Sequence, residues 1–253
     1  MMASQELRII PIRVQGEVRP GDSVAEKLLA ALKRQRLVLR KGDILIVKHK
    51  IISKSEGQFV ELSAIVPSEA SREWGRRYGV DARVTELALA QSRRIVRRER
   101  GVMITETRQG LVCANSGIDV SNVDGGKRAL LLPEDSDRSA ARLYSEIKKR
   151  VKLSIPVIIS DSFGRPWREG LTEAAIGVAA MKSLHDYRGK RDAHGYALRS
   201  SVEAVADELA CAAGLVCGKL KGSPACLVRG FRYQPGRGGA RALIRPAAAD
   251  LFR

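Results

Sequence analysis

The stretch IPVIISDSFGRPWREG, residues 155–170, decides how a sheet of this chain presents its polar groups. Residues 155–159 form an apolar run typical of a buried strand, and Ser160, Asp161 and Ser162 follow it at once. A strand that delivers a carboxylate and a hydroxyl at its carboxyl end is how open α/β sheets display ligand-binding groups. On these residues alone, a strand followed by an ordinary solvated turn remains the alternative.

A second passage has the same character: TETRQGLVCANSGIDVSN, residues 105–122. Residues 111–114 indicate another short buried strand, which runs into a cluster of small oxygen-bearing side chains that includes Asp119. Taken singly, such an aspartate is usually a turn or cap residue. Together, Asp119 and Asp161 can converge, and hard oxygen ligands from separate segments are what Mg²⁺ or Mn²⁺ with bound phosphates requires.

The size of the chain favours one large core. With 253 residues and 44% hydrophobic composition, the protein needs no disulfide support. No internal repeat or long linker divides it. We therefore expect a single domain over residues 1–253, or two interlocked lobes, with about 165–199 as a candidate inserted segment because glycines and charges are frequent there.

The charge balance is strongly basic. Lys and Arg number 45 against 28 Asp and Glu, a formal charge of +17, which predicts attraction to polyanions. The densest cluster, residues 93–100, has helical spacing and is interpreted as a solvated helix end. Only 4% of residues are aromatic, so stacking on bases is poorly supported and nucleic-acid binding is disfavoured, although it stays open as an alternative class.

The cysteines and histidines disfavour zinc. The cysteines, at 113, 211, 217 and 226, have apolar neighbours and no CxxC spacing, and the three histidines are not spaced as a metal pair. The N-terminal residues lack a signal pattern, and no apolar stretch approaches a membrane span. We expect a cytoplasmic protein with reduced cysteines and no membrane contact.

Strand and helix patterns mix without strict alternation, which predicts an α+β (mixed α/β) fold. Ser23 with Glu26 indicates a capping box, and Ser200 with Glu203 indicates another. Asp137 is expected to cap a helix ending near residue 151. The expected strands cover residues 9–14, 44–47, 103–105 and 225–228, and further helices cover about 68–78 and 84–98.

Two lysine-bearing segments are candidates for phosphate binding. Residues 214–220 approach a P-loop but are one residue short and lack its hydroxyl, so they are rejected as one. What remains is a basic, backbone-rich turn after a helix, with a lysine-favoured helix C-cap as the alternative interpretation. Lys54, at an expected strand exit, can bind phosphate as a point charge.

In order along nearly the whole chain, LRIIPI, GDILIVKHKIISKSEG, TETRQGLVCANSGIDVSNVD, LLPEDSD, VIISDSFGRPWREG, VADELACAAGLVCGK and RPAAADLFR resemble the coenzyme F420-0:L-glutamate ligase family. That resemblance implies an enzyme that uses GTP and a divalent metal, Mg²⁺ or Mn²⁺, to add L-glutamate to the F420 precursor. It also implies an unusual mixed α/β fold and an intertwined homodimer. The chain length leads us to expect the stand-alone form.

The resemblance also implies roles for individual residues. Asp119 and Asp161 are the expected catalytic residues, and with Ser162 they would hold the metal. Arg165 and Arg168 would contact the substrate. The residues expected around the nucleotide are Ile10, Pro11, Ile12, Arg13, His49, Lys50, Lys54, Asn122, Gly218, Lys219, Leu220, Lys221, Gly222, Ser223, Pro224 and Ala225.

Three departures from the family pattern bear on these roles. Ser162 stands where threonine is frequent, which keeps the oxygen. Lys219 stands where some relatives have glutamine, and a lysine puts a second metal in doubt. Leu171 and Glu173 replace glutamine and aspartate, which can alter the acceptor pocket. A related GTP-dependent amide ligase with another acyl substrate is therefore the alternative within enzymes.

Overall fold

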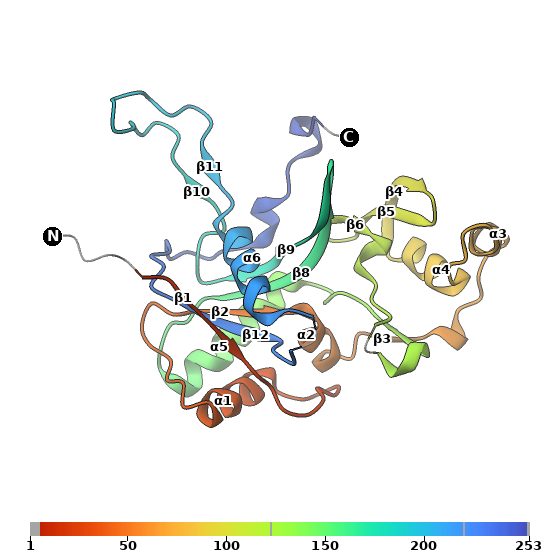
Figure 1. Ribbon diagram of the computed structural model, residues 1–253, viewed down its shortest axis with the longest axis horizontal. Helices are drawn as coiled ribbons and strands as arrows, with labels where there is room; N and C mark the ends of the chain where they lie inside the picture. The colour runs from red at the N-terminus through yellow and green to blue at the C-terminus, as the bar shows by residue number, and fades with distance from the viewer. Residues whose placement is uncertain (1–5, 122, 220, 252–253) are drawn as a thin grey trace.

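The computed structural model describes residues 6–121, 123–219 and 221–251, and a five-stranded mixed sheet forms the centre of this described part (Figure 1). Its strand order is β1-β12-β2-β8-β9. Only the β2–β8 pair is parallel, and the other three pairs are antiparallel. The strands are β1 (Arg8–Ile12), β2 (Ile44–Lys48), β8 (Val157–Arg165), β9 (Arg168–Ala179) and β12 (Ala225–Arg229). The predicted α+β class is confirmed.

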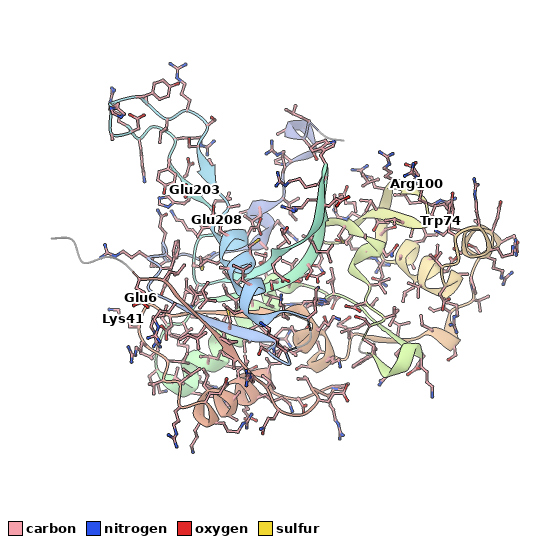
Figure 2. All side chains as sticks on the ribbon, viewed as in Figure 1. Glu6, Lys41, Trp74, Arg100, Glu203 and Glu208 are labelled. Atoms are coloured by element: carbon pink, nitrogen blue, oxygen red, sulfur yellow. The ribbon has the colours of Figure 1, made fainter. Side chains whose placement is uncertain are left out.

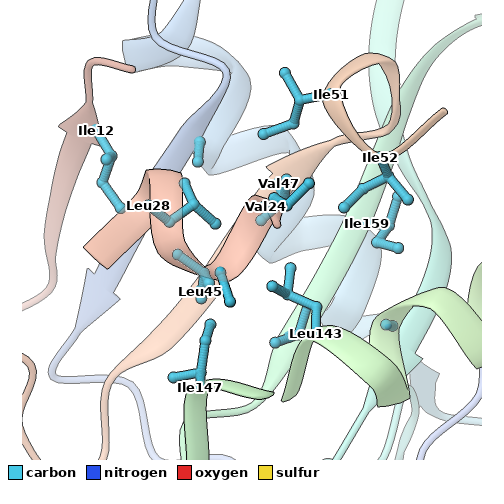
Figure 3. Packing of buried hydrophobic residues seen from close by; sticks show 14 of the residues in the cluster. Ile12, Val24, Leu28, Leu45, Val47, Ile51, Ile52, Leu143, Ile147 and Ile159 are labelled. Atoms are coloured by element: carbon cyan, nitrogen blue, oxygen red, sulfur yellow. The ribbon is translucent and has the colours of Figure 1, made fainter. Parts of the chain in front are cut away.

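Both faces of this sheet are buried. β2 is apolar at successive positions, and because successive side chains of a strand point to opposite faces, it places apolar side chains on each face. Leu45 and Val47 point to one face, where α1 (Val24–Arg34) and α5 (Ser136–Val151) cover them with Leu28, Leu143 and other apolar residues (Figure 3). Period-two alternation sends the neighbours of Leu45 and Val47 to the opposite face. There α6 (Val205–Cys217) packs over the sheet in a second core.

Two helix starts differ from prediction. α5 is capped by Asp135, whose side chain accepts from the Arg138 N–H at 2.9 Å, and not by Asp137. The Asp137 carboxylate instead accepts the backbone N–H groups of Val178 and Ala240, which ties the first turn of α5 to β9 and to the C-terminal segment.

The predicted capping box before α6 is also wrong. α6 begins after Ala204, which has no side-chain cap, and Glu203 lies in β11 (Val202–Glu203), paired with β10 (His185–Asp186). The predicted cap at Ser23 is confirmed, since Ser23 accepts from the Glu26 N–H. The helix predicted over about 68–78 is α3 (Glu69–Tyr78), which Ser68 caps.

A smaller lobe, residues 59–132, lies beside the main sheet, at the right in Figure 1. Figure 2 marks it with Trp74 and Arg100. It contains a two-stranded and a three-stranded sheet and two helices. Besides α3, its elements are β3 (Phe59–Glu61), α4 (Ala82–Ala90), β4 (Ser92–Glu99), β5 (Val102–Thr107), β6 (Val112–Ala114) and β7 (Arg128–Leu130), with 3₁₀ turns at Leu62–Ala64, Asn115–Gly117 and Asp124–Gly126.

The arginine cluster at residues 93–100 is a strand, not the predicted helix end. α4 stops at Ala90, and β4 pairs antiparallel with β5 through two register irregularities. Arg94 and Arg97 pair with Glu106 and Glu99, so carboxylates on the same sheet neutralise part of this cluster. The helical spacing misled because an irregular strand does not keep a strict two-residue period.

The polar stretch after residue 159 is also strand. β8 continues to Arg165 and turns into β9 at Pro166 and Trp167, so Asp161 lies within a long hairpin. Residues 168–179 of the expected insertion therefore belong to the central sheet. The arm that projects from the body in Figure 1 carries β10 and β11 and spans residues 185–203.

Among the described residues, no helix is long and apolar enough to cross a membrane. All four cysteines are free thiols, and three of them are buried. Two 3₁₀ turns, Ala240–Leu243 and Ala247–Ala249, complete the C-terminal segment.

Candidate active site

A cavity of about 600 Å³ opens where the carboxyl end of β2 meets β8. The carboxyl edge of parallel strands is where α/β sheets place ligands. Here α2 (His49–Ser55) starts directly after β2, the α6–β12 loop closes one side, and the segment after β6 closes the other. The cavity therefore lies between the central sheet and the smaller lobe.

Asp161 reaches this cavity from β8, on the side of α2. Its Oδ1 accepts the Ser162 N–H at 2.7 Å and lies 3.3 Å from Nε2 of His49. The imidazole is buried, and its Nδ1 lies 3.3 Å from the Ser53 hydroxyl on the next turn of α2. Contacts at both ring nitrogens fix the imidazole, and the imidazole in turn fixes the Asp161 carboxylate.

Asp119 reaches the same cavity from the smaller lobe. Its Oδ1 accepts from both the N–H and the hydroxyl of Ser121, and its Oδ2 lies 2.5 Å from the Lys50 ammonium on α2. Burial acts to raise the pKa of Asp119, but the hydrogen bonds from Lys50 and Ser121 outweigh it and hold this pKa below its ordinary value. Asp119 is therefore an anion at neutral pH.

Cys113, on β6, also borders the cavity. Burial raises the pKa of this thiol to about 12, and the negative charge of Asp161 adds to the shift. The thiol stays protonated at neutral pH, so it is no nucleophile there. β6 packs beside β8 at this point.

On the side of α6, Ser162 belongs to a hydrogen-bonded network around Glu173 of β9. The Ser162 hydroxyl donates to Oε1 of Glu173 at 2.7 Å and accepts from the Lys219 ammonium at 2.7 Å. The Ser160 hydroxyl donates to Oε2 of Glu173 at 3.0 Å, and Lys48 forms an ion pair with the same carboxylate. Glu173 is buried, so the ion pair between Lys48 and Glu173 at the end of this network is shielded from solvent.

Among the described lining residues, cations outnumber anions. Four lysines face three carboxylates, and the lysines come from β2, α2 and the α6–β12 loop. Two of those carboxylates, Asp119 and Asp161, come from the smaller lobe and from β8. Separate lysines with paired carboxylates suit a polyphosphate that carries a divalent cation, because each charge in such a ligand then has a partner.

The profile of the F420-0:Gamma-glutamyl ligase family matches residues 12–230. The chain belongs to this family. A protein of Methanopyrus kandleri, named coenzyme F420:L-glutamate ligase, is 40% identical over 252 residues, 98% of each chain. Proteins of the same name from Methanothermobacter thermautotrophicus and Methanocaldococcus jannaschii are 41% and 40% identical, over 93% and 84% of this chain and 94% and 85% of theirs.

Most of the site residues that were predicted from the sequence line this cavity. Asp119 and Asp161, far apart in the chain, both line it. So do the other site residues expected from the sequence at the following positions: His49, Lys50, Lys54, Ser162, Gly218, Lys219, Gly222, Ser223 and Pro224.

Other expected residues lie elsewhere. Arg165 and Arg168 flank the exposed hairpin turn, and Ala225 is buried in β12. Asn122 and Leu220 lie outside the described residues. Five more expected residues do not line the cavity: Ile10, Pro11, Ile12, Arg13 and Lys221. The turn at residues 14–18, which follows Arg13, lines the cavity instead of residues 10–13.

Lys54 lies in the last turn of α2 and not at a strand exit as expected. β2 ends at Lys48, and the following residues are helical. Lys54 pairs with Glu17 at 2.9 Å across the cavity mouth.

The sequence analysis gave no role to Lys48, named Ser160 only as part of the polar strand end, and noted Glu173 only as a departure from the family pattern. The signal that locates them is strand register. Lys48 pairs with Ser160 across β2 and β8, and Ser162 pairs with Glu173 across the hairpin.

Proposed function

We propose that this protein joins L-glutamate to the coenzyme F420 precursor, F420-0, through an amide bond, with GTP as the energy source. The observation that carries the proposal is the convergence of Asp119 and Asp161 on one lysine-lined cavity, in a chain that belongs to the F420-0:gamma-glutamyl ligase family. The names of its 40% identical relatives supply the reaction and the acyl substrate.

The cavity suits a nucleoside triphosphate by charge and by size. Its volume of about 600 Å³ lies within the range of ordinary ligand sites. Lys50 and Lys54 on α2 and Lys219 in the α6–β12 loop line it and offer point charges to phosphate oxygens. In the α6–β12 loop, Gly218 and Gly222 have φ of 60°, a conformation that lets backbone approach a ligand without a side chain between them.

The donor set suits a hard divalent cation. Asp119, Asp161 and Ser162 offer oxygen ligands, and the described residues contain no cluster of three or more His, Cys, Asp or Glu side chains that could hold a metal by themselves. Mg²⁺ is usually held in this way, by one or two carboxylates together with substrate phosphates and water. A Mg²⁺ or Mn²⁺ ion held there would neutralise charge on the phosphate oxygens during transfer.

The reaction that we propose has two steps. A carboxylate oxygen of F420-0 attacks the γ-phosphorus of GTP, the bond to the β-phosphate oxygen breaks, and GDP leaves. The amine of L-glutamate then attacks the acyl carbon of the resulting acyl phosphate, loses a proton, and displaces phosphate to leave an amide. The lysines hold the anions in line, and His49 keeps the Asp161 carboxylate in place during both steps.

The test uses purified protein with GTP, Mn²⁺, L-glutamate and F420-0. We expect GDP and a product heavier by one or more glutamyl groups, and we expect Asp119→Asn and Asp161→Asn to abolish both while circular dichroism shows the variants folded at the assay temperature. GDP formation without added glutamyl mass would refute F420-0 as the acyl substrate. It would favour an amide ligase with another acyl substrate, which Leu171, Glu173 and Lys219 leave open.

We further propose that the enzyme is a homodimer, as the family resemblance implies. The arm at residues 185–203 projects away from the body and offers a surface that a second copy can cover (Figure 1). Analytical ultracentrifugation tests this directly. A concentration-independent monomer mass would contradict it.

A further inference from the structure

The carboxylate of Glu173 lies behind the cavity and not on its surface. Its side chain is 9% exposed, and it is not among the cavity-lining residues, whereas Lys48 and Ser162, which contact it, are. Among the described residues, Glu173 therefore reaches the cavity only through these two neighbours. A buried carboxylate with such partners is costly to keep unless its contacts are well made.

The contacts to Glu173 determine which way the Ser162 hydroxyl presents its lone pairs. A serine hydroxyl has one proton to donate and two lone pairs. The proton goes to Oε1 of Glu173 at 2.7 Å, and one lone pair accepts from Lys219 at 2.7 Å. Within the described part of the chain the second lone pair has no partner and remains for the cavity, so Ser162 meets a ligand there as an acceptor of cations and donors.

Glu173 also holds Lys48, the last residue of β2. The Lys48 side chain is 20% exposed and its ammonium pairs with the Glu173 carboxylate, while the Ser160 hydroxyl donates to the other oxygen at 3.0 Å. This pairing keeps the Lys48 side chain at the base of the cavity beside Ser162. A rotamer-rich lysine side chain would otherwise lose more entropy when it contacts a ligand.

Gly214 of α6 makes room for this arrangement. A Cβ built at Gly214 would lie 2.8 Å from Cγ of Glu173, closer than carbon atoms approach without movement, and 3.8 Å from Oε1. The same helix fixes the backbone of Glu173, since the Cys211 thiol donates to the Glu173 carbonyl at 3.1 Å. With that backbone held, a larger residue at position 214 would displace the Glu173 side chain.

We propose that Glu173 is a positioning residue, seated in the space left by Gly214, which fixes the Lys48 ammonium and the Ser162 lone pairs toward the cavity. Its role in catalysis rests on the proposed function. Its role in holding Lys48 does not, which allows the two to be tested separately.

Gly214→Ala and Glu173→Gln test this role in different ways. The first keeps every charge and displaces the carboxylate, and alanine is favoured over glycine within a helix. The second keeps the shape and removes the charge opposite Lys48. Leu215→Ala is the matched control, because Leu215 neighbours Gly214 on α6 and is 81% exposed.

In the ligation assay we expect kcat to fall about 10- to 100-fold in both variants, as for the loss of a hydrogen bond to a charged group, while KM for L-glutamate holds. Melting temperature is measured alongside. Loss of activity only in proportion to loss of folded protein, or a wild-type kcat in Gly214→Ala, would overturn the proposal.

The second readout needs no ligation activity. Lysines are labelled briefly with acetic anhydride, and the modified peptides are counted by mass spectrometry, with Lys190 of the projecting arm as internal reference. We expect Lys48 to label faster in Gly214→Ala and Glu173→Gln than in the wild type and in Leu215→Ala. Unchanged labelling in both variants would overturn the positioning role, whereas faster labelling in a protein that forms no amide from F420-0 would refute only the proposed function.

Discussion

Replacing Lys50 by methionine tests whether this lysine and a divalent cation share Asp119. The Lys50 ammonium lies 2.5 Å from Oδ2 of Asp119, and the two side chains are 30% and 24% exposed. Exposed ion pairs contribute up to about 1 kcal/mol, and breaking a buried pair costs about 3–5 kcal/mol. A pair at this depth falls between them, so Lys50→Met should lower the free energy of unfolding by about 1–3 kcal/mol without added metal.

In a protein of this size that cost corresponds to a melting temperature lower by about 2–10 °C. The assay is thermal unfolding of both proteins, with and without saturating Mg²⁺. The ion should take over the charge partnership of Asp119, so the difference should shrink when Mg²⁺ is present. Calorimetric titration should also show tighter Mn²⁺ binding by Lys50→Met, because the competing ammonium is gone.

Lys54→Met is the matched control. Lys54 lies one turn further along α2 and is 13% exposed, but its partner Glu17 is 66% exposed and is not among the residues expected to hold the cation, so the cost of this substitution should not depend on Mg²⁺. An equal deficit of Lys50→Met in both conditions, with unchanged Mn²⁺ affinity, would refute the shared site.

Two further predictions concern carboxylates outside the cavity. Burial raises the pKa of Asp207, although the hydrogen bond from the Ala175 N–H opposes this, so the folded state loses stability as the pH rises above the ordinary value of 3.8. Asp207→Asn keeps the hydrogen-bond acceptor but does not titrate, so its melting temperature should depend less on pH than that of the wild type. Parallel curves of melting temperature against pH would contradict this. Arg229→Met should lower the free energy of unfolding in urea by about 3 kcal/mol, because it leaves the Asp43 carboxylate, 1% exposed, without its cation. The double variant with Asp43→Asn should recover part of this loss. A loss below about 1 kcal/mol in Arg229→Met would refute the prediction.

The sequence predicted the site better than it predicted the paths of the chain around it. Acidic and hydroxyl groups next to apolar runs pointed to Asp119 and Asp161, and both line one cavity. That inference depended on residue types and short-range order, which the sequence states directly. Lys219 and the glycine after α6 were found in the same way, because a helix C-cap leaves a local signal.

What the sequence could not supply was strand register. Residues 160–165 looked like a turn, but they form the outer half of a hairpin whose irregular pairing brings Glu173 opposite Ser162. A regular register from the turn at residues 166–167 would have placed a different residue there. Long-range pairing of this kind depends on the whole sheet, so the Glu173 network became visible only in the structure.

Heavy oxygen in the acyl carboxylate of F420-0 gives the most direct test of the central claim. The enzyme is incubated with GTP, Mn²⁺, L-glutamate and F420-0 labelled with ¹⁸O in that carboxylate. The masses of the F420 product and of the inorganic phosphate are then measured by mass spectrometry. We predict an F420 product that carries added glutamate, and inorganic phosphate that carries one ¹⁸O, with neither formed by Asp119→Asn. Glutamylated product accompanied by unlabelled phosphate would contradict activation of the carboxylate at this cavity.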